Sequence, residues 1–266
     1  MIKILFFGDI MGKIGRKGLT KALPKLKKKY KPDLVIANAE NLAHGKGITE
    51  KTLKEMISAG VDFFTSGNHV FSNAAEVEQI LSEGKLPIIR PANYPPGVPG
   101  DGYRVVEVGA YKILIVNLMG RVFFREQFDC PFRKLQEILD EYKDSNLAGV
   151  IVDLHAEATS EKNALPRYFD GQISAVIGTH THVQTADEQI LEKGTAMISD
   201  AGMVGLKNSS LGVGLDNVMK NFLTQTPAVH EIPETGTCQI DGIFAIIKPE
   251  TGLAESIERI KINVEV

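Results

Sequence analysis

Met1-Ile-Lys-Ile-Leu-Phe-Phe-Gly-Asp9, the first nine residues of the sequence, carries the pattern on which the fold prediction rests. An apolar run of aliphatic and aromatic side chains is followed at once by a glycine and a carboxylate. Such a run is typical of a strand that is covered on both faces of its sheet. The run is also shorter than the roughly 7–15 apolar residues of a secretory signal. We therefore expect a buried first strand in a cytoplasmic protein.

The same unit recurs through the first ninety residues, where short apolar runs alternate with longer amphipathic ones. This alternation predicts a parallel sheet with right-handed helical crossovers. Pro24 is expected to kink or split the first helix because it cannot donate a backbone hydrogen bond. The expected strands are Ile2–Phe7, Asp33–Ala39 and Val61–Thr65, and the expected helices are Ile14–Tyr30, Thr49–Ser58 and Asn73–Ser82.

The rest of the chain is richer in strands and contains no repeat and no linker that would separate two domains. We predict a single domain, residues 1–266, of the α/β class, with two sheets flanked by helices in a four-layer α/β/β/α sandwich. After a loop rich in proline and glycine, residues 90–102, the pattern predicts a hairpin of Tyr103–Val108 with Tyr111–Leu118, a helix over Pro131–Tyr142, and strands at Gly149–Leu154, Ser174–Ile177, Glu188–Leu191, Ala196–Ser199, Cys238–Ile247 and Ser256–Val264.

Composition excludes several classes of protein. The 266 residues are 43% hydrophobic and 24% charged with a net charge of −3, which argues against a general nucleic-acid coat or an anionic-membrane surface. No window approaches the roughly 18 apolar residues of a membrane span. Two cysteines are too few for a disulfide framework or a thiolate metal cluster. The basic stretch Lys13–Lys31 is expected to be the solvated face of a helix.

Polar side chains follow five of the predicted strands. In open α/β sheets ligands bind beyond the carboxyl ends of the strands, so these side chains are expected to converge. Carboxylate, amide oxygen and imidazole suit a divalent cation, and their number exceeds what one tetrahedral ion needs. Any one of the histidines fits a structural role equally well, but the combination predicts two metal ions. The candidates are Asp9, Glu40, Asn41, Asn68, His69, His155, His180 and His182.

The segment Gly178-Thr-His-Thr-His182 carries the strongest of these signals. Alternate residues of an extended segment project to the same side, so His180 and His182 are expected to serve two adjacent ions.

These motifs resemble those of the calcineurin-like metallophosphoesterases, through Asp9, Gly67-Asn-His69, His155 and Gly178-Thr-His-Thr-His182. The resemblance to the YmdB-type branch is closer and spans nearly the whole chain. It implies the four-layer fold, a di-metal centre, phosphodiesterase activity on 2′,3′-cyclic nucleotides, and self-association as a homo-oligomer. The motifs that carry it are Gly8-Asp-Ile-Met-Gly12, Asn38-Ala-Glu-Asn41, Arg90-Pro-Ala-Asn-Tyr-Pro95, Asn117-Leu-Met-Gly-Arg121 and Asp200-Ala-Gly-Met203.

The resemblance also implies a role for each candidate. Asp9, Glu40, Asn41 and His182 would hold one metal. Glu40, Asn68, His155 and His180 would hold the other, with Glu40 bridging. A hydroxide bridging the metals would attack phosphorus, and His69 would protonate the leaving oxygen as general acid. Nitrogen and oxygen ligands suit Fe, Mn, Zn, Mg or Co.

The sequence departs from the wider superfamily at Asp9-Ile-Met11, where a histidine is usual, and at Ala39-Glu40, where Gly-Asp is usual. Both departures are expected in the YmdB-type branch, with Asn41 in place of the missing ligand. Lys207-Asn-Ser-Ser210 stands where that branch would have a Tyr-Asp-Ser-like segment, which leaves substrate contacts there open.

Other residues have weaker claims to a role. Arg90 and Arg121 fit phosphate binding and surface pairing equally well. His44 lies close to the candidate ligands in sequence, whereas His230 has no expected role. For Phe71, Phe123 and Phe124, core packing is favoured over a base-stacking wall.

Two alternative functions remain open at this point. One is a broader phosphatase or nuclease on the same metal centre. The other is a regulatory protein that binds RNA or nucleotide and keeps the metals for structure. We favour a small phosphodiester as the substrate, and we expect no stable nucleic-acid complex and no membrane partner, because the net charge is slightly negative.

Overall fold

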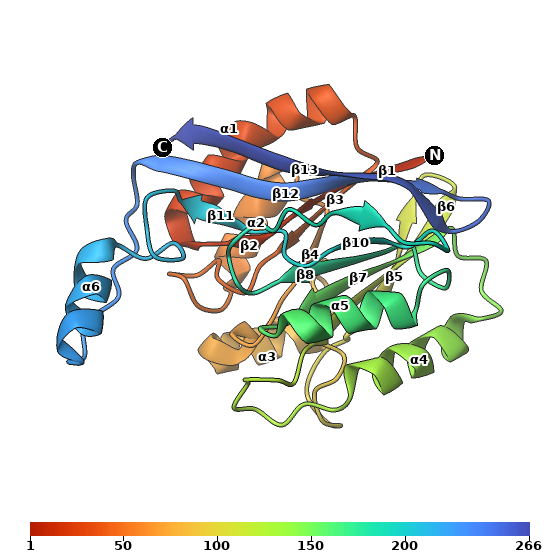
Figure 1. The fold of residues 1–266 in the computed structure, drawn as a ribbon, viewed down its shortest axis with the longest axis horizontal. Coiled ribbons are helices and arrows are strands. Elements are labelled where there is room, and N and C mark those ends of the chain that lie inside the picture. The colour runs from red at the N-terminus through yellow and green to blue at the C-terminus, as the bar shows by residue number, and fades with distance from the viewer.

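The computed structural model describes residues 1–266 and contains two sheets that lie face to face (Figure 1). The first sheet has the order β2-β11-β12-β1-β3-β4, and β13 pairs with β12 as well. Strands β1, β3 and β4 run parallel, as the alternation predicts, and β12 is antiparallel to β1. Its strands are β1 (Ile2–Phe7), β2 (Asp9–Ile10), β3 (Leu34–Asn38), β4 (Phe63–Thr65), β11 (Met203–Leu206), β12 (Thr237–Lys248) and β13 (Leu253–Glu265).

The second sheet has the order β5-β6-β7-β8-β10-β9. Strands β6, β7, β8 and β10 are parallel, while β5 forms the expected hairpin with β6 and β9 is antiparallel to β10. Its strands are β5 (Tyr103–Val108), β6 (Tyr111–Met119), β7 (Gly149–His155), β8 (Ala175–Thr179), β9 (Gln189–Ile190) and β10 (Ala196–Ile198).

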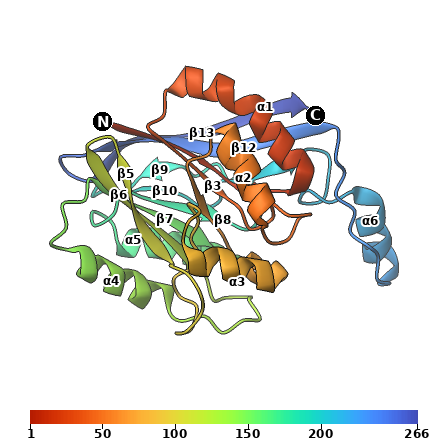
Figure 2. The same ribbon diagram turned by 180° about the vertical axis from the view of Figure 1, so that it is seen from behind.

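Six α-helices and one short 3₁₀ helix, η1 (Val70–Asn73), accompany the sheets. In Figures 1 and 2, α1 and α2 lie over the first sheet and α4 and α5 over the second, while α6 projects from the body. The helices are α1 (Gly12–Tyr30), α2 (Glu50–Ala59), α3 (Ala74–Glu83), α4 (Pro131–Tyr142), α5 (Thr159–Tyr168) and α6 (Leu215–Thr224).

Three apolar clusters separate the four layers. In β1, Ile4 and Phe6 enter the cluster between the two sheets, whereas Leu5 and Phe7 enter the one beneath α1 and α2. The third cluster joins the second sheet to α4 and α5, for example through Leu135. Because successive side chains of a strand point to opposite faces, a continuous apolar run is needed when both faces are covered. The predicted α/β/β/α sandwich is confirmed.

Pro24 does not split the first helix, since α1 is continuous from Gly12 to Tyr30. Pro24 is exposed, so water can reach the carbonyl group that has lost its backbone donor. On the opposite face Leu19, Leu23 and Leu26 are buried and hold the helix to the sheet. Tertiary packing therefore outweighs the local preference of proline.

Two helices were not expected from the sequence, α5 and α6. Helix α5 contains Pro166 and buries Lys162, so its segment lacks an amphipathic pattern. Helix α6 buries only Val218, and four of its apolar side chains are exposed. The α6 segment does carry apolar residues at helical spacing, Leu215, Val218, Met219, Phe222 and Leu223, and the sequence analysis missed this pattern. No helix in the structure has both the length and the apolar character needed to cross a membrane.

Candidate metal centre

The carboxyl ends of parallel strands in both sheets deliver the candidate residues to one place. Strand β1 is followed by Asp9, β3 by Glu40, β4 by Asn68, and β8 by His180, while His155 is the last residue of β7. The first three strands belong to one sheet and the last two to the other. The candidate centre therefore lies where the two sheets meet at their carboxyl edges, as expected from the position of the polar residues.

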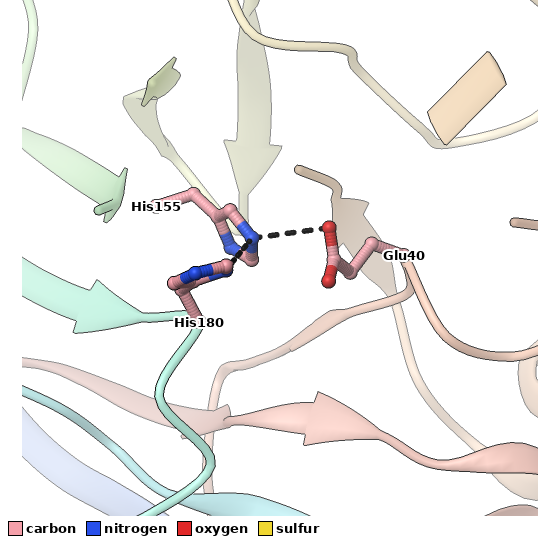
Figure 3. Close-up of side chains that lie close together, drawn as sticks. All are labelled: Glu40, His155 and His180. Carbon is pink, nitrogen blue, oxygen red and sulfur yellow. Dashed lines mark hydrogen bonds and ion pairs between the residues drawn. The ribbon is translucent and has the colours of Figure 1, made fainter. Parts of the chain in front are cut away.

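Glu40, His155 and His180 form a first group of ligand atoms (Figure 3). His155 Nε2 lies 3.0 Å from Glu40 Oε2 and 3.1 Å from His180 Nδ1, and Asn68 Oδ1 is also 3.1 Å away. One proton on Nε2 can satisfy only one of these contacts. Two ligand atoms about 2.1 Å from one ion lie about 3 Å apart when they are at right angles. The spacing therefore suits a shared cation.

Asp9, Glu40 and His182 form a second group, so Glu40 belongs to both. Asp9 Oδ1 and Asn41 Oδ1 are buried and have no hydrogen-bond partner. The Asn41 amide nitrogen donates to Gly45 O at 2.9 Å, which leaves its oxygen free. Buried acceptors without a partner are rare, and a cation would satisfy both of these. The residues of the two groups thus fit a pair of metal ions in their chemistry.

The segment from His180 to His182 does not have the extended backbone that the sequence argument assumed. Strand β8 ends at Thr179, and His180 and His182 have φ angles of 100° and 62°, in the left-handed region. Histidine is one of the residues that adopts this region more readily, but each case costs conformational energy. The two side chains still reach different groups, because the backbone turns rather than alternates.

A buried pair beneath this segment holds it in place. Asp200 Oδ2 accepts hydrogen bonds from the backbone N–H of Thr181 at 3.0 Å and from its hydroxyl at 2.8 Å. Lys162 Nζ donates to the same oxygen at 2.6 Å and to Thr179 O at 2.9 Å. Both Lys162 and Asp200 are buried. Lys162 was missed by the sequence analysis, and Asp200 was noted only as part of a family motif.

A second buried network orients His155. Its Nδ1 lies 2.8 Å from Thr179 Oγ1, which donates to Asp153 Oδ1 at 2.7 Å. Asp153 Oδ2 accepts from the Asn38 amide at 2.9 Å. With Nδ1 occupied, Nε2 is left to a cation, an arrangement that is usual behind metal-bound histidines. Asp153 precedes His155 by two residues on β7, and this i, i+2 spacing was the signal that could have identified it.

Similar partners orient the other two histidines. His180 Nε2 lies 3.1 Å from Glu157 Oε2, so Nδ1 faces the first group. His182 Nδ1 lies 3.0 Å from Leu211 O, which leaves Nε2 for the second group. Glu157 was also missed by the sequence analysis, because nothing in its local pattern distinguishes it from a surface carboxylate.

Burial shifts the pKa values of the ligand side chains. It raises the pKa of Asp9, because a carboxylate loses the stabilisation of water there. Burial also opposes the charge on Glu40, but His155 and the backbone of His69 hold the Glu40 pKa below its usual value. Burial, together with charge on His155, lowers the pKa of His180 to about 3. His180 is therefore neutral at pH 7 and can donate a lone pair.

His69 lies at the rim of the site rather than in either ligand group. Its backbone N–H donates to Glu40 Oε2 at 3.2 Å, and its ring Nδ1 is 3.4 Å from the Asn68 amide nitrogen. The ring is partly buried, and this burial lowers the pKa of His69 while Glu40 opposes the shift.

Most of the weaker candidates lie outside the site. Arg90 donates to the carbonyl groups of Pro91, Val98 and Pro99, so it holds its own loop. The side chains of Arg121, His44, His230 and Lys207 are exposed. The expectation of core packing is wrong for Phe123, which is 82% exposed, because its loop turns outward there with a φ of 72°.

Comparison with known proteins identifies the family of this chain. A sequence model of the family described as YmdB-like protein matches residues 5–260. The chain is 44% identical over 262 residues, 98% of its length and 97% of the relative's, to a 2′,3′-cyclic-nucleotide 2′-phosphodiesterase of Bacillus subtilis (strain 168).

Solved structures show the same relationship. A crystal structure described as a novel phosphatase of Mycoplasma pneumoniae superposes with a TM-score of 0.91 at 36% identity, covering 99% of this chain and 94% of the other. The fold alone is shared with an NAD nucleotidase of Haemophilus influenzae, at a TM-score of 0.58 and 19% identity, covering 99% of this chain and 56% of that one. With a family match over nearly all its length, the chain belongs to the YmdB-like protein family, and the predicted branch is confirmed.

Proposed function

We propose that this protein is a metal-dependent phosphodiesterase that hydrolyses 2′,3′-cyclic nucleotides. The observation that carries the proposal is Glu40, whose carboxylate belongs to both groups of ligand atoms in a chain similar end to end to such an enzyme. A carboxylate shared by two ligand sets is the usual way to hold two metals close together for displacement at phosphorus.

The ligands follow from the two groups and from the unpartnered oxygens. We assign Asp9, Glu40, Asn41 and His182 to one metal. We assign Glu40, Asn68, His155 and His180 to the other. When bound, the metals lower the pKa of a water to supply a hydroxide nucleophile and neutralise the phosphate oxygens. The donor set suits Fe, Mn, Zn, Mg or Co.

His69 is assigned the role of general acid, which protonates the departing ribose oxygen. Its ring is partly buried, belongs to neither ligand group and contacts the Asn68 amide through Nδ1, so Nε2 is the nitrogen proposed to transfer the proton. A centre that only binds metal has no need of such a residue. Proton transfer of this kind contributes typically 10²–10⁴-fold to the rate.

Three variants test the assignments. Glu40→Ala should lose both metals and activity, measured by metal analysis and by hydrolysis of 2′,3′-cyclic AMP. His69→Ala should keep both metals and lose about 10²–10⁴-fold in kcat. His230→Ala, at an exposed histidine outside the site, is the matched control and should resemble the unmodified protein.

Each assignment has a contradicting outcome. A Glu40→Ala protein with two metals and normal activity on bis-p-nitrophenyl phosphate would refute the shared ligand. Full kcat in His69→Ala would refute the general acid. A metal-loaded protein that binds 2′,3′-cyclic AMP without turnover would favour a regulatory binding protein.

A broader phosphatase on the same centre is the second candidate, favoured by the similarity to the Mycoplasma pneumoniae phosphatase. A phosphomonoester such as p-nitrophenyl phosphate distinguishes the two functions. The cyclic diester should be hydrolysed with the higher kcat/KM if the proposed function is right.

Two further expectations concern the whole protein. We propose that residues 1–266 act as one domain, since side chains from both sheets make up the centre. We also propose that the protein self-associates and acts in the cytoplasm. The self-association follows from the family resemblance, and light scattering of the metal-loaded protein would measure it.

A further inference from the structure

A row of aromatic rings leads to the candidate centre and meets it at His180. The Phe124 ring lies 5.0 Å from the His180 ring, and Phe128 lies 6.0 Å from Phe124. Tyr94 lies 4.9 Å from Phe128, and Phe71 lies 5.4 Å from Tyr94. We call Phe71, Tyr94, Phe124 and Phe128 the aromatic wall. It begins two residues after the proposed acid, His69, and ends on a proposed metal ligand, His180.

The loop that carries half of this wall is fixed to the centre. The backbone N–H of Gly120 donates to the carbonyl of His155 at 2.9 Å. The carboxylate of Glu161 accepts from the backbone N–H groups of Arg121 at 2.9 Å and Val122 at 3.1 Å. These bonds tie both ends of the turn before Phe123 to strand β7 and helix α5. These bonds therefore hold the loop that carries Phe124 and Phe128 beside the centre.

Phe123 has two unfavourable features. Its side chain is 82% exposed, more than any other large apolar side chain that is exposed in this chain. Its φ of 72° lies in the left-handed region, which a bulky residue rarely adopts. An exposed side chain on a strained backbone adds nothing to the hydrophobic core or to the stability of the fold. Phe123 is thus strained and exposed, and it precedes Phe124, whose ring lies against the proposed metal ligand His180. This combination indicates that the Phe123 ring is available to bind a substrate.

There is space for a ligand beside Phe124 and Phe128. These two rings line a hollow of about 430 Å³ together with Val122 and the polar side chains of Arg121, Glu126, Gln127 and Glu161, and Phe123 stands between Val122 and Phe124 in the chain. Sites for small molecules are about 300–1,000 Å³ in volume and combine apolar walls with a few polar groups. A flat aromatic group of a ligand can stack on the rings, while the polar side chains reach its edge.

We propose that Phe123 and Phe124 determine substrate specificity by stacking on the nucleobase, with Phe128 packed against Phe124 in the aromatic wall. The inference rests on the proposed function, because the metals would fix the cyclic phosphate and leave the base to be held nearby. Stacking accepts every base but favours the larger purine surface. The protein should therefore prefer 2′,3′-cyclic AMP to 2′,3′-cyclic UMP.

The test compares substrates with and without a base. Phe123→Ala should raise KM for 2′,3′-cyclic AMP by roughly 5- to 150-fold, with kcat within twofold of the unmodified enzyme. Neither value should change for methyl riboside 2,3-cyclic phosphate, which lacks a base. Phe123→Tyr should restore the low KM, and Phe123→Ala should lose the preference for adenine over uracil.

Two further variants separate stacking from structure. Phe124→Leu keeps an apolar side chain against His180 and should likewise raise KM only for the substrate with a base. Phe222→Ala removes an exposed phenylalanine from α6 and should change nothing. Metal content should stay constant in all these variants. Equal losses on both substrates, or no change in Phe123→Ala, would overturn the proposal.

Failure of the proposed function would be seen separately, as an unmodified enzyme that hydrolyses neither substrate. Calorimetric binding of adenosine 3′-monophosphate would then decide the inference. Weaker binding to Phe123→Ala would support stacking, and equal binding would overturn it.

Discussion

At the residue scale, the centre depends on Gly67, where any side chain would occupy the space of two proposed metal ligands. A Cβ atom on Gly67 would lie 2.3 Å from Glu40 Oε2 and 2.4 Å from His155 Nε2. Both side chains are buried and cannot move aside without losing their contacts. Glycine is thus required here for space, because a proposed bridging ligand and a proposed ligand of the second metal pack directly against its Cα.

Gly67→Ala should therefore lose at least one of the two metals and most of the activity while keeping the fold. Metal analysis and the far-UV circular dichroism spectrum measure the two effects. Gly214→Ala is the matched control, since its nearest contact would be 3.5 Å away at an ordinary φ of −56°. Full metal content in Gly67→Ala would show that the two ligands can be rearranged.

At the element scale, α5 acts through one buried side chain. Lys162 joins this helix to the carbonyl of Thr179 and to Asp200, which in turn holds the backbone between His180 and His182. A buried ion pair contributes little net stability over an apolar pair, but breaking it leaves an uncompensated charge. The helix is therefore coupled to the segment that carries two proposed ligands.

Lys162→Met should lower the free energy of unfolding by about 3–5 kcal/mol because Asp200 remains buried without its partner. Urea denaturation of the metal-free protein measures this loss. Lys134→Met on α4 is the control, since its ion pair with Glu137 lies at the surface and is worth about 1 kcal/mol or less. Equal effects of the two substitutions would mean that Asp200 finds another partner.

At the scale of the whole molecule, the centre joins two sheets that are also connected by apolar packing and by buried hydrogen bonds such as that from Asn38 to Asp153. Asp9 and Glu40 follow strands of one sheet, and His155 and His180 come from the other. A cation bound between them stabilises only the folded arrangement. Binding and folding are then linked by mass action.

Removal of the metals by a chelator should therefore lower Tm, and their return should raise it. The stabilisation should be about 4 kcal/mol for each ion at a concentration 1,000-fold above its Kd. As one domain, the protein should unfold in a single transition in calorimetry with or without metal. Glu40→Ala should be nearly insensitive to the chelator. A Tm that metals do not affect would contradict a centre built from both sheets.

The sequence by itself determined most strands of the two sheets and the polar residues at their ends, because both depend on local patterns. Runs such as Ile2–Phe7 must be apolar throughout when helices and a second sheet cover both faces. A polar residue after such a run, such as Asp9 or His155, lies at the carboxyl edge whatever the rest of the chain does. Local patterns did not predict the strand register or the short strands β2 and β11.

Only the tertiary structure decided how the residues meet. Glu40 joins two ligand groups, His180 and His182 turn through left-handed backbone, and Lys162 is buried against Asp200. The aromatic wall likewise joins rings more than fifty residues apart along the chain, from Phe71 to Phe128. These features depend on which groups, distant in sequence, are buried together. Burying an unpaired charge or an unsatisfied acceptor is costly, and only the folded chain determines which groups pair with one another.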